Sequence, residues 1–380
     1  MDALMLPLNW QRVRLGDIAE IIGGGTPSTQ IKSFWNGSIN WFTPTEIGIT
    51  KYVYKSQRTI TPLGLKKSSA KLLPIGTILL TSRASIGDCA ILKVVATTNQ
   101  GFQSLIPLEK INNEFLYYLM LTLKNKLLKL ASGSTFLEVS PNKIKNLLIP
   151  LPPLNEQIAI ANILSDVDRY LYSLDALILK KEGVKKALRI KMLNQILASN
   201  GVEFKKIGEI CLIKRGRVIA KKILQENGKY PVYSSQTLNN GILGFIDTYD
   251  FDGEFLTWTT DGAYAGSIFY RNGRFSITNV CGLLQVIQDN ILHKYLYYIL
   301  QITAPLHVNP GMGNPKLMSA AMQQIEIPLP PLNEQIAIAN ILSALDHEII
   351  SLKNKKRQFD NIKKALNHDL MSAKIRVLKK

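Results

Sequence analysis

The stretch IPLPPLNEQIAIANILS stands at Ile149–Ser165 and recurs, identical at every position, at Ile327–Ser343. Each residue of the second copy is therefore numbered 178 higher than its counterpart. The similarity continues more loosely downstream, where Asp168 matches Asp346. A long repeat of this kind indicates a duplicated structural unit, so the chain is expected to contain the same arrangement twice.

Both copies begin with a proline-rich segment and continue as a long helix. The prolines before each helix exclude a helix interior and favour an extended backbone. Downstream of Asn155 and Asn333, the expected N-caps, neither copy contains proline, and Gly183 is the only glycine before the first copy ends. We therefore predict two helices of about 45 residues, each about 65 Å long at ~1.5 Å per residue.

Apolar residues in both predicted helices recur at steps of three and four, the a/d spacing of a coiled coil. In the second copy these positions are Leu342, Leu345, Ile349, Leu352, Lys356, Phe359, Lys363, Leu366 and Leu370, and in the first they are Leu164, Val167, Leu171, Leu174, Ile178, Lys181, Lys185, Leu188 and Met192. The alternative is two ordinary amphipathic helices in separate cores. Because helices of this length rarely stand alone, we expect the two to pair with each other.

The segments before the helices resemble each other faintly. LGDIAEI at Leu15–Ile21 corresponds to IGEICLI at Ile207–Ile213, and FLYYL at Phe115–Leu119 corresponds to YLYYI at Tyr295–Ile299. Apolar runs and alternating patterns closed by turn residues predict strands between these landmarks. We therefore predict an α+β protein with two mixed globular halves, 1–153 and 200–331, each followed by a repeat helix, 154–199 and 332–380.

Composition favours a folded protein with a polyanionic partner. The 380 residues are 46% hydrophobic and carry 46 basic against 28 acidic groups, a net charge of +18. Residues 1–153 hold 17 basic and 8 acidic groups, and residues 200–331 hold 12 and 10. A basic surface gains affinity for DNA by releasing counterions from phosphates, so nucleic acid is a candidate partner and the first half is the more basic one.

Other function classes find no support in the sequence. No apolar run is long enough for a membrane span and no signal-peptide pattern opens the chain, so we expect a cytoplasmic protein without membrane contact. Three scattered cysteines and four scattered histidines predict neither disulfides nor a metal site. Gly23–Gly25 matches no nucleotide-binding motif and is expected to form a simple turn, and we expect no cofactor.

With the repeat in view, the chain resembles the DNA-specificity subunit of type I restriction-modification systems. The resemblance rests on two variable halves alternating with two similar helices, on PLPPLNEQ before each helix, and on GGGTPS at Gly23–Ser28 followed by FWNGSINWFTPTEI at Phe34–Ile47. It implies that each variable half is a target recognition domain that reads one part of a split DNA sequence. It also implies an antiparallel coiled coil between the halves, and association with adenine-methylating subunits and, through the complex, with restriction subunits.

The identical helix starts suggest that each presents the same surface to the same partner, giving two copies of that partner. The candidate contacts are the apolar residues there, which could instead pack on their own globular half or do some of both. They are Leu154, Ile158, Ile160, Leu332, Ile336 and Ile338.

Candidate DNA contacts are residues in predicted loops whose side chains can read base edges or hold phosphates. In the first half these are Thr26, Ser28, Thr43, Thr45, Arg83, Asn99, Gln100, Ser132 and Ser134. In the second half they are Arg215, Arg217, Ser234, Ser235, Gln236, Thr260, Asp261, Tyr264, Asn279, Asn309 and Asn314. Any one of them could instead be a turn residue or a satisfied polar group.

Two alternatives to a DNA-specificity subunit remain open at this point. A DNA methyltransferase would need an [Asn/Asp]-Pro-Pro-[Tyr/Phe] element, whereas the proline pairs here lie in LPPL, and no nuclease site or nucleophile with a histidine base is evident. A coiled-coil scaffold without sequence-specific DNA binding would explain the helices but not two divergent globular halves. The sequence therefore favours a non-catalytic protein that recognises DNA.

Overall fold

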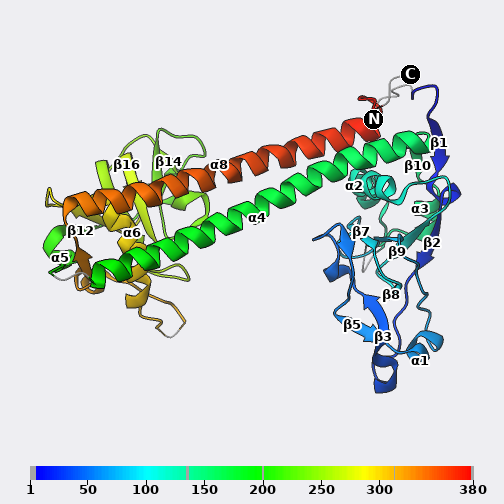
Figure 1. Ribbon diagram of the computed structural model, residues 1–380, viewed down its shortest axis with the longest axis horizontal. Coiled ribbons are helices and arrows are strands. Elements are labelled where there is room, and N and C mark those ends of the chain that lie inside the picture. Colours follow the sequence, from blue (N-terminus) through cyan, green and yellow to red (C-terminus); the bar gives the residue numbers. More distant parts are fainter. Residues whose placement is uncertain (1–5, 134–136, 199–200, 312, 378–380) are drawn as a thin grey trace. The chain divides into compact units, whose positions relative to one another are not determined.

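The structure is a computed structural model that describes residues 6–133, 137–198, 201–311 and 313–377. It divides into two compact units, Met1–Leu174 with Lys355–Lys380, and Asp175–Asn354. Each unit contains one globular half and a segment of each long helix (Figure 1).

The first unit is built on a five-stranded sheet of order β2-β9-β6-β7-β4, beside a three-stranded sheet of order β5-β3-β8. The strands are β2 (Ala19–Gly23), β3 (Trp35–Phe42), β4 (Tyr52–Val53), β5 (Arg58–Ile60), β6 (Ile78–Leu80), β7 (Cys89–Leu92), β8 (Ala96–Thr98) and β9 (Gln103–Pro107). The short apolar strands β6 and β7 are fully buried, and helix α2 (Asn113–Leu130) packs on them. Short helices α1 (Pro62–Lys66) and α3 (Pro141–Lys145) complete the globular part.

The second unit repeats this plan with a six-stranded sheet of order β12-β17-β15-β16-β13-β14. Its strands are β12 (Cys211–Arg215), β13 (Tyr230–Tyr233), β14 (Ile242–Ile246), β15 (Phe251–Thr259), β16 (Ile268–Ile277) and β17 (Cys281–Val286). Helix α6 (His293–Thr303) packs on β15 and β16, and the short helices α5 (Ile207–Ile210) and α7 (Ser319–Gln323) pack on each other. The orders β2-β9-β6-β7 and β12-β17-β15-β16 correspond strand for strand, which confirms the predicted internal repeat and the mixed α and β content.

A two-stranded ribbon leads into each long helix. Strand β1 (Gln11–Arg14) pairs with β10 (Leu148–Leu151), and β11 (Glu203–Lys206) pairs with β18 (Glu326–Leu329). The proline-rich segments are therefore extended, as predicted, and a ribbon tolerates proline because both of its strands are edges.

The long helices are α4 (Leu154–Ala198) and α8 (Leu332–Met371). The predicted N-caps are wrong, because Asn155 and Asn333 both lie inside the first turn. The carbonyl of Pro153 accepts the first helical hydrogen bonds, from the amides of Glu156 and Gln157 at 2.9 and 3.0 Å. Each helix therefore begins two residues before the start that an asparagine cap would give, with Pro153 or Pro331 at the cap position.

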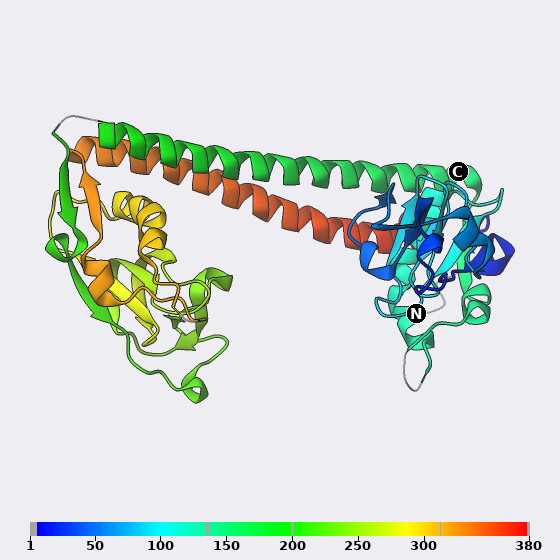
Figure 2. The same cartoon turned by 90° about the horizontal axis from the view of Figure 1, so that it is seen from below.

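The two helices pair antiparallel in each unit, as Figures 1 and 2 show. In the first unit Asp168 of α4 forms an ion pair with Lys363 of α8, and the rings of Tyr170 and Phe359 lie 4.7 Å apart. In the second unit the ion pairs are Lys181 with Glu348 at 2.9 Å, Glu182 with Lys353 at 2.6 Å, and Lys185 with Asp346. Lysines that interrupt the apolar seam thus find carboxylates on the opposite helix.

The apolar positions of the predicted seam supply the buried contacts. The seam residues with less than a tenth of their surface exposed are Leu164, Leu171, Leu174, Ile178, Leu342, Ile349 and Leu370. Among the described residues, no helix combines the length and the apolar character that crossing a bilayer requires.

Candidate nucleic-acid interface

Loops from five parts of the first globular half gather at one place, which we call the first loop cluster: residues 24–28, 43–46, 82–83, 98–101 and the described part of 132–139. Four backbone hydrogen bonds connect them. The amide of Gly25 donates to the carbonyl of Thr98 (2.9 Å), Asn99 to Phe42 (3.1 Å), Ser82 to Gly101 (2.8 Å) and Val139 to Ser82 (3.1 Å).

Gly24 and Gly25 of the GGGTPS motif lie where the backbone closely approaches neighbouring segments. A Cβ on Gly24 would lie 1.9 Å from the carbonyl oxygen of Asn99, and a Cβ on Gly25 would lie 2.3 Å from the Ser69 hydroxyl. None of Gly23–Gly25 has a positive φ, and residues 24–28 form no turn, so the expected turn is wrong. Instead, an extended segment runs against a neighbouring loop closely enough that side chains are excluded.

Most first-half candidates lie at the surface of the first loop cluster. Exposed side chains are Thr26, Ser28, Thr45, Gln100 and Ser132, and half-buried ones are Thr43, Arg83 and Asn99. Thr26 and Gln100, which are far apart in sequence, are hydrogen-bonded to each other. Ser134 lies outside the described residues.

Several of these side chains already have protein partners. The hydroxyl of Thr43 donates to Glu46 at 2.8 Å, Arg83 pairs with Glu138 at 2.8 Å, and the Asn99 side-chain oxygen accepts from the Gly101 amide at 2.8 Å. Ser132 accepts from Lys143 at 2.9 Å. These bonds fix the loops, and Thr26, Ser28, Thr45 and Gln100 are left as the more accessible groups.

The second globular half gathers a corresponding set, the second loop cluster: residues 215–217, 233–241, 260–266, 278–280 and the described part of 309–317. Here too backbone hydrogen bonds join the loops. Gly216 donates to Cys281 (3.3 Å), Thr278 to Tyr233 (2.9 Å), Thr260 to Val280 (3.1 Å), Leu317 to Thr260 (2.8 Å) and Gly262 to Pro315 (3.0 Å).

The second-half candidates differ in accessibility. Exposed side chains are Arg215, Arg217, Tyr264, Asn279, Asn309 and Asn314, and half-buried ones are Ser234, Ser235, Gln236 and Asp261. Thr260 is fully buried, so its hydroxyl faces the protein interior.

Several side chains of the second loop cluster also bind other residues of the same chain. Arg215 donates to the carbonyl of Asn279 at 2.6 Å, and Arg217 pairs with Asp250 at 3.0 Å. Gln236 donates to the carbonyl of Ile242, and Asn309 accepts from the Gly311 amide at 2.9 Å. The clusters therefore share a position in the repeated fold while presenting different side chains.

Equivalent glutamines in the two copies connect each globular half to its long helix. Gln157 accepts from the Asn112 amide at 2.8 Å and donates to the carbonyls of Lys110 and Pro152 at 3.1 and 2.9 Å. Gln335, its counterpart in the repeat, makes the same three contacts at 2.9, 3.0 and 2.9 Å, with Leu292, Asn290 and Pro330. Gln157 and Gln335 thus connect the start of each long helix to the start of α2 or α6.

A second repeated contact, the Tyr-Asp-Lys cluster, involves three elements. Tyr118 of α2 donates to Asp168 at 2.5 Å while Lys363 pairs with the same carboxylate. Tyr298 of α6 donates to Asp346 at 2.8 Å while Lys185 pairs with it. Burial, and then the hydrogen bond to the aspartate, raise the pKa of both phenols, so both remain donors. Tyr117, Tyr118 and Tyr298 are buried, and Tyr297 is half-buried.

Asp168→Asn and Asp346→Asn are each expected to lower the free energy of unfolding by about 1–3 kcal/mol, because a half-buried lysine and a phenol lose a charged partner. The measurement is urea unfolding of the full chain. Asp166→Asn is the matched control, since its ion pair with Arg169 is exposed at both ends and is expected to contribute less than about 0.5 kcal/mol. Equal effects at Asp166 and Asp168 would contradict this role of the cluster.

The candidate partner-binding residues divide between core and surface. Ile160 is fully buried and Ile338 half-buried against their own globular halves. Leu154, Ile158, Leu332 and Ile336 keep about two-fifths of their surface exposed, between 41% and 45%. Four apolar side chains, two in each copy, thus remain accessible at the helix starts.

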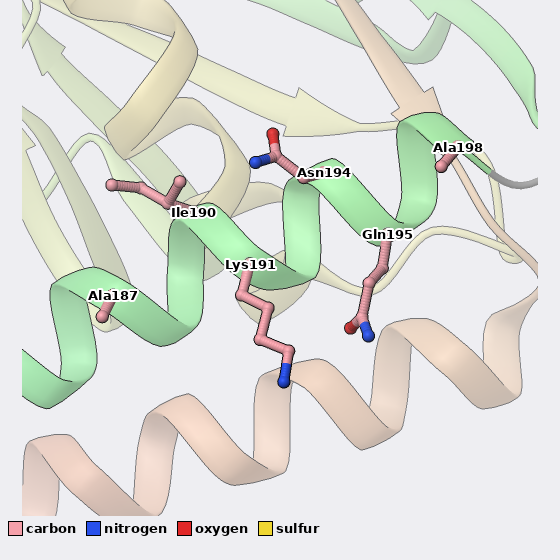
Figure 3. Close-up of a pocket in the computed structure, with 6 residues that line it drawn as sticks. All are labelled: Ala187, Ile190, Lys191, Asn194, Gln195 and Ala198. Carbon is pink, nitrogen blue, oxygen red and sulfur yellow. The ribbon is translucent and has the colours of Figure 1, made fainter.

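The second unit has a hollow along one of its long helices. This hollow of about 530 Å³ runs along α4 and is lined by Ala187, Ile190, Lys191, Asn194, Gln195 and Ala198. Figure 3 shows Lys191 and Gln195 pointing from α4 toward α8, and Asn194 pointing away from it. These side chains offer no nucleophile with a neighbouring base.

The thiols are unsuited to nucleophilic chemistry. Cys89, Cys211 and Cys281 are buried, and burial raises the pKa of each thiol to about 12. A protonated, buried thiol is a poor nucleophile. In the part of the chain that the structure describes, no three His, Cys, Asp or Glu side chains gather as metal ligands.

Comparison with known proteins agrees with the repeat. Residues 7–181 and 199–359 match the family model for the type I restriction modification DNA specificity domain. The chain therefore belongs to this family of DNA specificity proteins. Its role is that of the non-catalytic subunit that provides DNA target specificity.

Individual relatives cover the chain to different extents. The chain is 28% identical over 419 residues to the type I restriction enzyme MjaIX specificity subunit of Methanocaldococcus jannaschii, across 99% of this chain and 96% of that protein. It is 52% identical over 138 residues to the putative type I specificity subunit S.MpnORF289P N-terminus of Mycoplasma pneumoniae, across 36% of this chain and 74% of that protein. The crystal structure of a type I restriction-modification S subunit from M. genitalium shares the fold, with a TM-score of 0.64 at 20% identity over 96% of this chain and 98% of that one.

Proposed function

We propose that the first and second loop clusters each read one half of a bipartite, asymmetric DNA target. The observation that carries this proposal is the repeated fold, which places two loop clusters at equivalent positions with different side chains. Because different side chains face the DNA, the two half-sites should differ in sequence. In this proposal residues 1–153 and 200–331 are the target recognition domains, and 154–199 with 332–380 are the helices that set the spacing between half-sites.

The polar groups in each cluster can make contacts to base edges and to phosphates. Gln100 and Asn279 are exposed amides that can bind adenine edges, and Arg215 can bind guanine or a phosphate. Hydroxyls such as Thr26 and Ser28 suit phosphate contacts. The greater positive charge of the first half suggests that it provides more of the salt-dependent affinity.

The partners in this proposal are two copies of an adenine-methylating subunit, and restriction subunits that join through the complex. The exposed apolar pairs Leu154 with Ile158, and Leu332 with Ile336, are the proposed contacts for the methylating subunits. Their equivalence in the repeat supports two equivalent sites. In this proposal the protein acts on chromosomal DNA in the cytoplasm, and the chain needs no cofactor of its own.

The proposal that each loop cluster reads one half-site is tested by Gln100→Ala and Asn279→Ala in the full chain assembled with its methylating subunits. Each variant is expected to relax base preference in one half of the target, at a cost of about 1–3 kcal/mol per lost base contact, and to leave the other half unchanged. Selection of binders from a randomised duplex pool reports both halves at once. Loss of preference in both halves from a single substitution would contradict separate reading.

A further inference from the structure

Arg271 is a buried cation at the centre of the second globular half. It lies on β16 with 3% of its surface exposed, and its Nε donates to the Thr257 hydroxyl at 3.1 Å. Its guanidinium lies 3.5 Å from the ring centre of Tyr233 and 4.6 Å from that of Phe269. The guanidinium is therefore in cation–π contact with two aromatic rings, which restrict its orientation.

Within the described residues this cation has no carboxylate counterion. Its Nη1 is buried without a hydrogen-bond partner, and the groups that act on it electrostatically are Tyr233, Cys281 and Tyr297. Burial lowers the pKa of Arg271 to about 10, so the group is still charged at neutral pH. A buried charge without a counterion lowers the free energy of unfolding. Stability of the folded protein therefore does not account for an arginine at this position.

The repeat shows that the fold itself does not require a cation here. Strand β7, the counterpart of β16 in the first unit, reads Cys-Ala-Ile-Leu and is buried at all four positions. Arg271 is therefore a feature of the second globular half, where the side chains differ between the two units.

The 233–241 loop of the second loop cluster lies against this guanidinium. A Cβ on Gly241 would stand 3.1 Å from Arg271 Nη2, and Gly241 has a φ of +81°. Asn239 and Asn240 also have positive φ values, 49° and 54°. Three successive left-handed residues are uncommon, so the loop's shape depends on what it packs against.

We propose that Arg271 is the positioning residue of the second loop cluster, holding the 233–241 loop in its DNA-reading shape and taking its counterion from the bound DNA. This rests on the proposed function. A duplex against the loop brings phosphates near a cation in a low-dielectric setting, where attraction is strongest. The charge that destabilises the free protein then stabilises the complex, as expected of a residue retained for function.

The test compares Arg271→Met, Arg271→Lys and Arg274→Met in the full chain. Arg274 is the matched control because it lies on the same strand but is exposed and paired with Asp252 at 2.9 Å. Two quantities are measured for each variant: the melting temperature of the free protein, and the affinity for a duplex carrying the target found by methyladenine mapping, against the same duplex with the second half-site scrambled.

Arg271→Met is expected to melt at the same temperature as the parent or a few degrees higher, while losing about tenfold or more in affinity, all in the second half-site. Arg274→Met should lose less, and Arg271→Lys should recover part of the loss because lysine keeps the charge without the planar guanidinium. A lower melting temperature for Arg271→Met, or unchanged affinity, would overturn the inference. If the parent chain itself shows no preference for the mapped duplex, the proposed function fails and the inference fails with it.

Discussion

Glu156→Ala is expected to lower the free energy of unfolding by about 3 kcal/mol or more, whereas Glu334→Ala changes it by less than about 0.5 kcal/mol. The two glutamates occupy the same position of an identical 17-residue sequence, so their intrinsic helix properties are equal. Their surroundings differ, because Glu156 is 1% exposed and Glu334 is exposed.

The difference comes from what covers Glu156. Its carboxylate accepts from the Trp10 indole at 3.1 Å and from Arg376 at 2.8 and 3.2 Å, with Asn9 at 3.4 Å. Removing it leaves a partly buried guanidinium and a buried indole N–H without their acceptor. Urea unfolding of both variants gives the comparison, and similar losses at the two positions would show that these contacts do not stabilise the first unit.

The second large effect is expected at Gly24, where alanine should lower affinity for the target duplex on the order of 100-fold, with the loss confined to the first half-site. A Cβ there would lie 1.9 Å from the carbonyl oxygen of Asn99, so the two loops that carry Thr26 and Gln100 must separate. The forced displacement should also cost about 2 kcal/mol of stability.

Gly23→Ala is the control for Gly24→Ala. The nearest atom to a Cβ on Gly23 is a Gln103 side-chain oxygen at 3.6 Å, an ordinary contact, so this variant should bind like the parent. Duplex-binding titrations of both variants, with either half-site scrambled, check the prediction. Equal affinities for the two variants would mean that the first loop cluster does not depend on this close approach.

The repeat made the fold predictable from the sequence, because an identical stretch must begin the same structure twice. Lys185 and Lys363 occupy matching seam positions and pair with Asp346 and Asp168, which also match, so the structure shows that these ion pairs follow the repeat. The paired helices follow from a seam spacing that the structure confirms. These are local and periodic signals, which one sequence carries well.

The features that could not be predicted from the sequence depend on contacts between residues far apart in the chain. Glu156 differs from Glu334 only because of residues 146 and 220 positions away, which no local pattern indicates. Gly23–Gly25 were expected to form a turn, because the neighbours that restrict Gly24 and Gly25, the Asn99 backbone and Ser69, are distant in sequence. Arg271 was not singled out at all, since its missing counterion is visible only in three dimensions.

Which loops meet can be predicted from the sequence more readily than which of their side chains are accessible. Polar residues in loops were predicted for both clusters, and backbone hydrogen bonds do bring those loops together. The accessibility of each side chain is set by tertiary packing, as the buried Thr260 and the exposed Asn279 show.

The central claim is that this chain determines which DNA sequence is modified, and mapping methyladenine across a genome tests it most directly. The adenine methyltransferase is expressed with and without this chain, and modified positions are located by single-molecule sequencing. We expect methylation at one asymmetric, split motif that appears only when this chain is present. Methylation that is unchanged by removing this chain would contradict it.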